Sequence, residues 1–142
     1  TSTCGRSSSS SIRIELDELL PQVDVLSLHC PITEHTRGMI GAAQLARMKP
    51  DAVLINTARG GLVDAEALAE ALRAGRLGGA AIDVLVQEPP VDGNALLAAD
   101  LSNLIVTPHT AWAAKESRQR AIDELAANVG DFFAGGQRGR VV

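Results

Sequence analysis

The chain has 142 residues, the size of one domain, and its content of 46% apolar and 21% charged residues is typical of a globular domain. The net charge of −4 argues against nonspecific binding to nucleic acid, and the apolar runs are too short to cross a membrane. Two cysteines cannot form a disulfide framework, and the first eleven residues hold no apolar signal segment, so we expect a cytoplasmic location without nucleic-acid or membrane partners.

The N-terminal part of the chain predicts little regular structure before a short helix. Residues 1–11 are rich in serine, and we expect them to be irregular or disordered. The ordered part is expected to begin near Ile12 and to carry a single core. Helical spacing over residues 16–20 predicts a short helix that stops at Pro21.

Four apolar runs of strand length then alternate with helical patterns. The predicted strands are residues 23–29, 52–56, 79–84 and 104–107. The predicted helices are residues 40–48, the stretch from the cap Asp64 to Gly75, and about 114–133. Without a hairpin signal between the strands, this alternation predicts right-handed crossovers and a parallel sheet covered by helices on both faces. The expected fold class is therefore α/β.

Polar side chains follow all four predicted strands. In an open parallel sheet, ligands bind outside the carboxyl ends of the strands. His29 and Thr33 come after the first strand, Arg59 follows the second, Asp83 and Glu88 follow the third, and His109 follows the fourth. If the sheet is parallel, a cation, a carboxylate and an imidazole converge on one edge.

Three of these side chains each have a functional and a plainer interpretation. Arg59 precedes two glycines and can hold a carboxylate through two hydrogen bonds, or else form a surface ion pair beside a turn. His109 can transfer a proton during carbonyl chemistry, or else lie in a loop without a role. Glu88 can accept a hydrogen bond from His109 and orient its ring, or else have no partner.

A metal site is not expected. His29, Cys30 and His35 lie close in sequence, but their spacing matches no zinc pattern, and four convergent ligands are not evident. No serine or cysteine lies on a glycine-flanked nucleophile turn. These observations leave Arg59, Glu88 and His109 as the candidate catalytic residues.

Four motifs follow one another in the chain: Leu28-His29-Cys30-Pro31, Ile55-Asn56-Thr57-Ala58-Arg59-Gly60, Ile82-Asp83-Val84 with Glu88-Pro89, and Thr107-Pro108-His109-Thr110-Ala111-Trp112. In this order and spacing they resemble the signatures of the D-isomer-specific 2-hydroxyacid dehydrogenases. The last motif is most similar to the glycerate dehydrogenase (hydroxypyruvate reductase) branch. The resemblance implies an oxidoreductase that transfers a hydride between NAD or NADP and a small D-2-hydroxy or 2-oxo acid, such as glycerate or hydroxypyruvate.

The resemblance also implies a role for each candidate residue. Arg59 would bind the substrate carboxylate, His109 would be the general acid or base, and Glu88 would pair with His109. Asp83 would hold the nicotinamide carboxamide. The cofactor would also meet the adenine-pocket residues Cys30 and Pro31, the residue Thr36 near the ribose or phosphates, and the backbone of Thr57, Ala58, Arg59, His109, Thr110 and Ala111.

The sequence departs from that family in containing no G-x-G-x-x-G turn. We therefore expect residues 12–142 to form the C-terminal part of a dinucleotide-binding domain, a partial Rossmann-like parallel sheet with flanking helices that lacks the first βα unit and is inactive by itself. Members of the family are usually dimers, so a homodimer is expected. Two alternatives stay open: a non-catalytic cofactor-sensing or interaction module, and an inactive truncated product.

Overall fold

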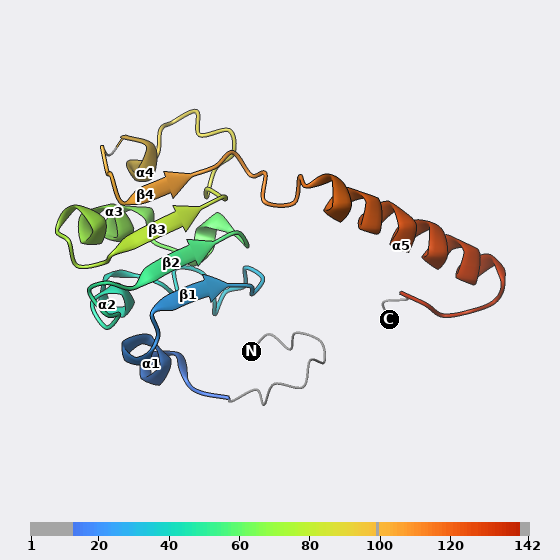
Figure 1. Cartoon of the computed structure of the whole chain (residues 1–142), viewed down its shortest axis with the longest axis horizontal. Helices are drawn as coiled ribbons and strands as arrows, with labels where there is room; N and C mark the ends of the chain where they lie inside the picture. Colours follow the sequence, from blue (N-terminus) through green and yellow to red (C-terminus); the bar gives the residue numbers. More distant parts are fainter. Residues whose placement is uncertain (1–12, 99, 140–142) are drawn as a thin grey trace. The chain divides into compact units, whose positions relative to one another are not determined.

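The computed structural model describes residues 13–98 and 100–139 (Figure 1). The chain divides into two compact units, Thr1–His109 and Thr110–Val142. The sheet belongs to the first unit and one long helix to the second. The segment 1–11, predicted to be irregular, lies outside the described residues.

Four parallel strands form the sheet, and each lies within its predicted run: β1 (Val25–Leu28), β2 (Val53–Asn56), β3 (Gly79–Ile82) and β4 (Leu104–Val106). The strands lie side by side in sequence order. Their last residues are partners across the sheet, in the register Leu28, Asn56, Ile82 and Val106. The chain therefore leaves all four strands at one level, along one edge of the sheet.

Short helical segments precede the first strand and connect the others. They are α1 (Leu16–Leu19), the 3₁₀ turn η1 (Leu20–Gln22), α2 (Ala42–Leu45), the 3₁₀ turn η2 (Gly60–Leu62), α3 (Ala65–Arg73) and α4 (Ala95–Ala98). The sequence pattern did not predict α4, which is a single turn.

The ends predicted for α3 are confirmed. The Asp64 carboxylate accepts hydrogen bonds from two backbone N–H groups of the first turn, each at 3.1 Å, as an N-cap does. Gly75 has φ +64°, and the N–H of Arg76 donates to the carbonyl of Ala71 at 2.9 Å. This is the pattern of a Schellman motif, which ends a helix at a left-handed residue.

Two helix predictions differ from the structure. The helix predicted over residues 40–48 spans only Ala42–Leu45. After Leu45 the N–H groups of Arg47 and Met48 donate to carbonyls three residues back, as in a 3₁₀ turn. Before Ala42, Ile40 forms a parallel bridge with Val63, and its carbonyl accepts a hydrogen bond from the N–H of Asp64 at 3.0 Å. Tertiary pairing thus occupies backbone groups that a longer helix would use. The first α-helix ends at Leu19, ahead of Pro21 as predicted, but the chain continues into the 3₁₀ turn η1, where proline lies in the first turn and no N–H donor is needed.

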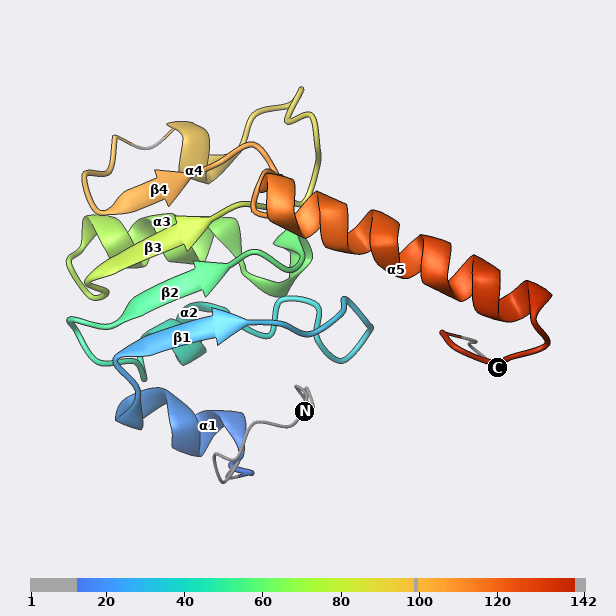
Figure 2. The same cartoon turned by 45° about the vertical axis from the view of Figure 1, so that its right-hand side comes forward.

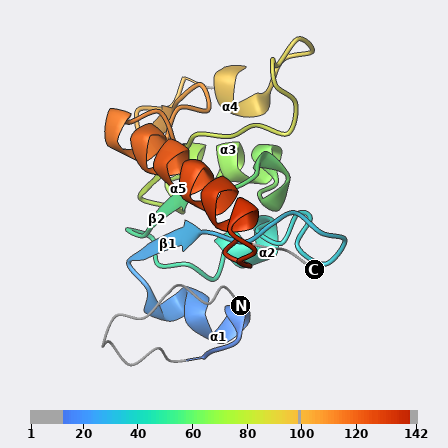
Figure 3. The ribbon, with the colours of Figure 1, turned by 90° about the vertical axis from the view of Figure 1, so that its right-hand side faces the viewer.

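The helices bury one face of the sheet. Strands β1, β2 and β3 alternate strictly, and their buried side chains are Leu26, Leu28, Leu54, Asn56, Ala80 and Ile82. Leu45 of α2 and Leu68 and Leu72 of α3 belong to the same core. Figures 2 and 3 show α2, α3 and α4 on the same side of the sheet.

The prediction that helices cover both faces is wrong for the described part of the first unit. On the other face, Val25 is 55% exposed and Ile105 is 64% exposed. Right-handed crossovers that advance in one direction across a sheet place every helix on the same side. Helices reach both faces when the strand order reverses, and the order β1-β2-β3-β4 contains no reversal.

The second unit is built on α5 (Lys115–Phe133), which lies within the predicted range. No residue of α5 is buried. The predicted apolar stripe is from 47% to 82% exposed, at Ile122, Leu125, Val129 and Phe133. Among the described residues, we find no helix with the length and apolar character needed to cross a bilayer.

Candidate active site

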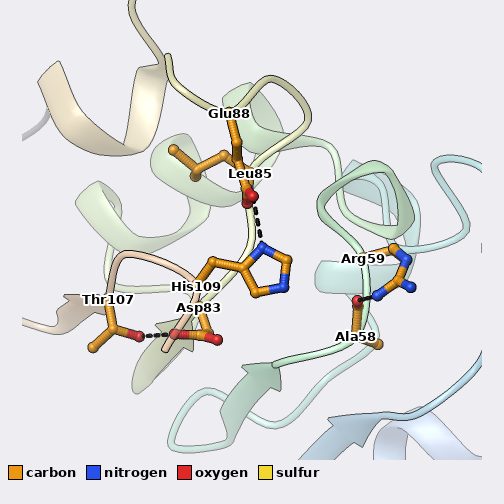
Figure 4. Close-up of polar contacts among 7 residues, drawn as sticks. All are labelled: Ala58, Arg59, Asp83, Leu85, Glu88, Thr107 and His109. Atoms are coloured by element: carbon orange, nitrogen blue, oxygen red, sulfur yellow. Dashed lines mark hydrogen bonds and ion pairs between the residues drawn. The ribbon is translucent and has the colours of Figure 1, made fainter. Parts of the chain in front are cut away.

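The polar residues that follow the strands lie at the carboxyl edge of the sheet. Arg59 comes from the loop after β2, Asp83 and Glu88 from the segment after β3, and His109 from the segment after β4. Figure 4 shows Glu88 at one ring nitrogen of His109, while the other nitrogen points to the side on which Arg59 lies. The parallel register therefore brings together three groups that are far apart in the chain.

A short hydrogen bond joins Glu88 to His109, with Oε2 2.6 Å from Nδ1 (Figure 4). The backbone N–H of Leu85 donates to the other carboxylate oxygen, Oε1, at 2.7 Å. The hydrogen bond from His109, and next the one from Leu85, lower the pKa of Glu88, against smaller opposing effects of burial and Asp83. Since an ionised carboxylate only accepts hydrogen bonds, Nδ1 of His109 carries a proton in this pair.

The backbone of His109 is held in an uncommon conformation. Its φ is +55°, in the left-handed region that residues other than glycine seldom adopt. The N–H of His109 donates to the carbonyl of Asp83 at 2.9 Å, which ties the end of β4 to the end of β3. Such local strain persists only where the surrounding structure holds it, and it is frequent at functional sites.

Asp83 is 4% exposed, and its carboxylate accepts a short hydrogen bond from the hydroxyl of Thr107 (Figure 4). Its backbone N–H donates to the carbonyl of Asn56 at 2.9 Å. A buried carboxylate directly after a strand is costly unless polar partners compensate it. Asp83 is therefore placed to accept hydrogen bonds at the edge of the sheet.

Arg59 is exposed, and its Nη1 donates to the carbonyl of Ala58 at 2.6 Å. Within the part of the chain that the structure describes, its guanidinium forms no ion pair. The side chain of Asn56, which is fully buried, holds the loop in place: Nδ2 donates to the carbonyl of Arg59 at 2.9 Å, and Oδ1 accepts from Ala58 N–H at 3.1 Å. The loop thus presents a cation on a fixed backbone.

A shallow depression of about 300 Å³ gathers several of the predicted cofactor-binding residues: it is lined by His29, Cys30, Pro31, Thr57, Ala58 and Arg59. Thr36 lies outside this lining, in a turn where its hydroxyl donates to the carbonyl of Pro31 at 2.8 Å. Thr110 and Ala111 belong to the second unit, so their predicted roles stay predictions. No three His, Cys, Asp or Glu side chains gather as metal ligands in residues 13–98 and 100–139.

A larger cavity, of about 370 Å³, opens beside the Glu88–His109 pair and has a mostly apolar lining. Its lining includes Leu85, Leu97 and Val106 but not Arg59. A substrate that contacts both His109 and Arg59 therefore extends beyond this cavity.

Three structural partners of the site were not singled out from the sequence. They are Asn56, which holds the Arg59 loop, Thr107, which donates to Asp83, and the N–H of Leu85, which donates to Glu88. A polar residue that ends an otherwise apolar buried strand could have drawn attention to Asn56. The backbone donor of Leu85 has no signal in the sequence.

Comparison with known proteins agrees with the resemblance seen in the motifs. Residues 5–111 match the family model of the "D-isomer specific 2-hydroxyacid dehydrogenase, NAD binding domain". The chain is 58% identical over 122 residues to a glycerate dehydrogenase of Methylorubrum extorquens. The aligned region covers 86% of this chain and 39% of that protein.

Solved structures share the fold. An acyclic imino acid reductase in complex with NADPH and D-Arg superposes with a TM-score of 0.79 at 33% identity, over 96% of this chain and 44% of that one. A D-isomer specific 2-hydroxyacid dehydrogenase from Lactobacillus delbrueckii ssp. bulgaricus, in its NAD-complexed form, gives a TM-score of 0.78 at 32% identity, over 91% and 43% of the two chains. The chain thus spans less than half the length of each protein compared. The family model, the shared fold and the similarity to the glycerate dehydrogenase agree: this chain belongs to the D-isomer-specific 2-hydroxyacid dehydrogenase family and matches its NAD-binding domain.

Proposed function

We propose that this chain carries the proton-transfer and carboxylate-binding groups of an enzyme that interconverts a small D-2-hydroxy acid and the corresponding 2-oxo acid, with glycerate and hydroxypyruvate as the first candidates. The observation that supports the proposal most is the Glu88–His109 hydrogen bond of 2.6 Å at the strand edge that also carries Arg59. The similarity to a glycerate dehydrogenase is what favours glycerate among the 2-hydroxy acids.

The three side chains divide the work by their chemistry. The guanidinium of Arg59 binds the substrate carboxylate through two parallel hydrogen bonds. The Nε2 atom of His109 delivers a proton to the carbonyl oxygen during reduction and removes it during oxidation. Glu88 fixes the tautomer of His109 by accepting from Nδ1, and its negative charge stabilises the imidazolium that forms when a hydroxy acid is oxidised.

The residues at the edge fit part of a nicotinamide dinucleotide. Asp83 offers a buried carboxylate acceptor for the carboxamide group, and the open depression beside Cys30 and Pro31 offers space for the adenine. When bound, the cofactor accepts or donates the hydride. The sequence contains no glycine-rich phosphate turn, so we expect weak binding by this chain alone. Titrating the chain with NADH and with NADPH by calorimetry measures both the affinity and the choice between the two.

Substitutions in an enzyme that contains this segment test the catalytic roles. In steady-state assays with hydroxypyruvate, we expect His109→Ala to lower kcat by about 10²–10⁴-fold, since that is the contribution of a general acid. Arg59→Ala is expected to raise KM as well, because it removes the carboxylate partner. His35→Ala, in an exposed turn, is the matched control and should leave both constants unchanged. Unchanged turnover in His109→Ala would end the proposal.

Two further expectations belong to the same proposal. Homodimer formation is expected, and size-exclusion chromatography with light scattering measures it on this chain. A stable monomer would contradict it. The cytoplasmic location also stays a prediction.

A further inference from the structure

The glycine after Arg59 touches the turn that carries Glu88. A Cβ atom built on Gly60 would lie 2.1 Å from the carbonyl carbon of Leu85 and 2.5 Å from the backbone nitrogen of Val86. Both are backbone atoms, so a side chain at this position would push the turn away.

The displaced residue would be the one that holds Glu88. Leu85 donates its N–H to Oε1 of Glu88 at 2.7 Å, while Oε2 meets Nδ1 of His109 at 2.6 Å. The carboxylate is therefore fixed between one backbone donor and one ring donor. A movement of Leu85 removes the donor at Oε1 and frees the carboxylate to rotate away from His109.

We propose that Gly60 is a positioning residue for the Glu88–His109 pair: because it has no side chain, the Arg59 loop rests on the Leu85 turn and sets the donor that orients Glu88. The proposal deepens the proposed function, on which it rests for the catalytic meaning of the pair. The backbone contact between Gly60 and Leu85 thus links the loop of Arg59, the predicted carboxylate-binding residue, to the Glu88–His109 pair, which is predicted to transfer the proton.

A glycine-to-alanine substitution in the 142-residue chain tests the proposal. The measurement is the pH titration of the Glu88 side-chain carboxyl carbon by NMR, which needs neither cofactor nor substrate. A finding that the chain has no part in a dehydrogenase would therefore leave this test intact. In Gly60→Ala the Leu85 bond is lost, and we expect the midpoint of the Glu88 titration to rise toward the ordinary value of a glutamate.

Two matched variants separate this effect from a general disturbance. In Gly61→Ala the added Cβ would meet side chains and no backbone: the end of Ile32 at 3.1 Å and Nη1 of Arg37 at 3.8 Å. In Gly78→Ala it would lie 2.6 Å from the carbonyl oxygen of Asp51, which is also a collision with backbone, just before β3 and at the opposite edge of the sheet. Both should leave the Glu88 midpoint where it is in the wild type. A folded Gly60→Ala chain with an unchanged midpoint, or an equal shift in Gly78→Ala, overturns the proposal.

A second variant acts on the next step of the chain of contacts. Replacing the backbone amide of Leu85 by an ester removes the N–H donor and keeps the side chain. The Glu88 midpoint should rise as it does in Gly60→Ala, and a wild-type midpoint would overturn the proposal. If Gly60→Ala fails to fold while Gly78→Ala folds, Gly60 is needed for folding of the whole unit. That result would also overturn the proposal, which confines the role of Gly60 to the Leu85 turn.

Discussion

The buried side chain of Asn56 allows a quantitative test of how the Arg59 loop is held. Asn56 is fully buried at the end of β2, and it bridges the backbone of the loop with one hydrogen bond from Nδ2 to the carbonyl of Arg59 and one from Ala58 N–H to Oδ1. Asn56→Ala removes both bonds and leaves the strand itself unchanged. We therefore expect the substitution to disturb the backbone of the Arg59 loop more than the hydrogen bonds between the strands.

The magnitude follows from the two partners that the substitution leaves behind. An N–H that loses its partner in the interior costs about 1–3 kcal/mol, and the half-buried Ala58 belongs toward the lower end of that range. The carbonyl of Arg59 keeps a second donor, the N–H of Leu62 at 3.2 Å, so its loss is close to the net value of one hydrogen bond, about 1 kcal/mol. Together they lower the free energy of unfolding by about 2–3 kcal/mol.

Asn103→Ala is the matched control, because Asn103 also joins two backbone groups but at the other end of the sheet. Its Nδ2 donates to the carbonyls of Leu72 and Leu77 at 3.3 and 3.4 Å, long bonds whose loss should cost about 1 kcal/mol or less. Urea unfolding is followed through the amide signals of β2 and β3, since Trp112 lies in the second unit. If Asn56→Ala proves no more destabilising than Asn103→Ala, the reasoning is refuted.

Four further substitutions test the fold and the Glu88–His109 pair in urea unfolding. Because the folded-state pKa of Glu88 is lowered, its contribution to stability is present above the unfolded-state pKa, about 4.3, and is lost as the pH falls through the folded-state pKa. The difference in the free energy of unfolding between wild type and Glu88→Gln should therefore shrink on acidification. A difference that does not change with pH would contradict this. Asp64→Ala removes the N-cap of α3 and should lower the free energy of unfolding by about 1 kcal/mol. An unchanged free energy of unfolding would show that the helix does not need this cap. Leu54→Ala in the core should cost about 3–5 kcal/mol, whereas Ile105→Ala on the exposed face should stay within about 0.5 kcal/mol.

The fold could be predicted from the sequence where a pattern is local. Each strand lies within its predicted apolar run, and α3 begins and ends at the predicted Asp64 and Gly75. The extent of α2 could not be predicted, because Ile40 is drawn into a bridge with Val63, a residue that no local window contains. The covered face could not be predicted either, because it depends on the direction in which the strands are added across the sheet.

The site shows the same division between local and tertiary information. Polar residues that follow an apolar run show where Arg59, Asp83 and His109 leave the sheet, and a parallel register then suffices to place them on one edge. The contact of Gly60 with Leu85 joins two loops whose approach depends on the packing of the whole unit. The left-handed φ of His109 depends on a backbone hydrogen bond to Asp83, which is likewise a tertiary contact.

The geometry of this edge depends mainly on groups other than the three that would do the chemistry. Backbone donors orient Glu88 and His109, a buried amide holds the loop of Arg59, and a bare glycine lets the two loops meet. A site built in this way keeps its shape when a reacting side chain is exchanged for one of similar size, but loses it when a supporting group is enlarged or removed. A chain that has the guanidinium, the carboxylate and the imidazole but a larger residue in place of the glycine should therefore lack the paired arrangement, although its motifs would look complete.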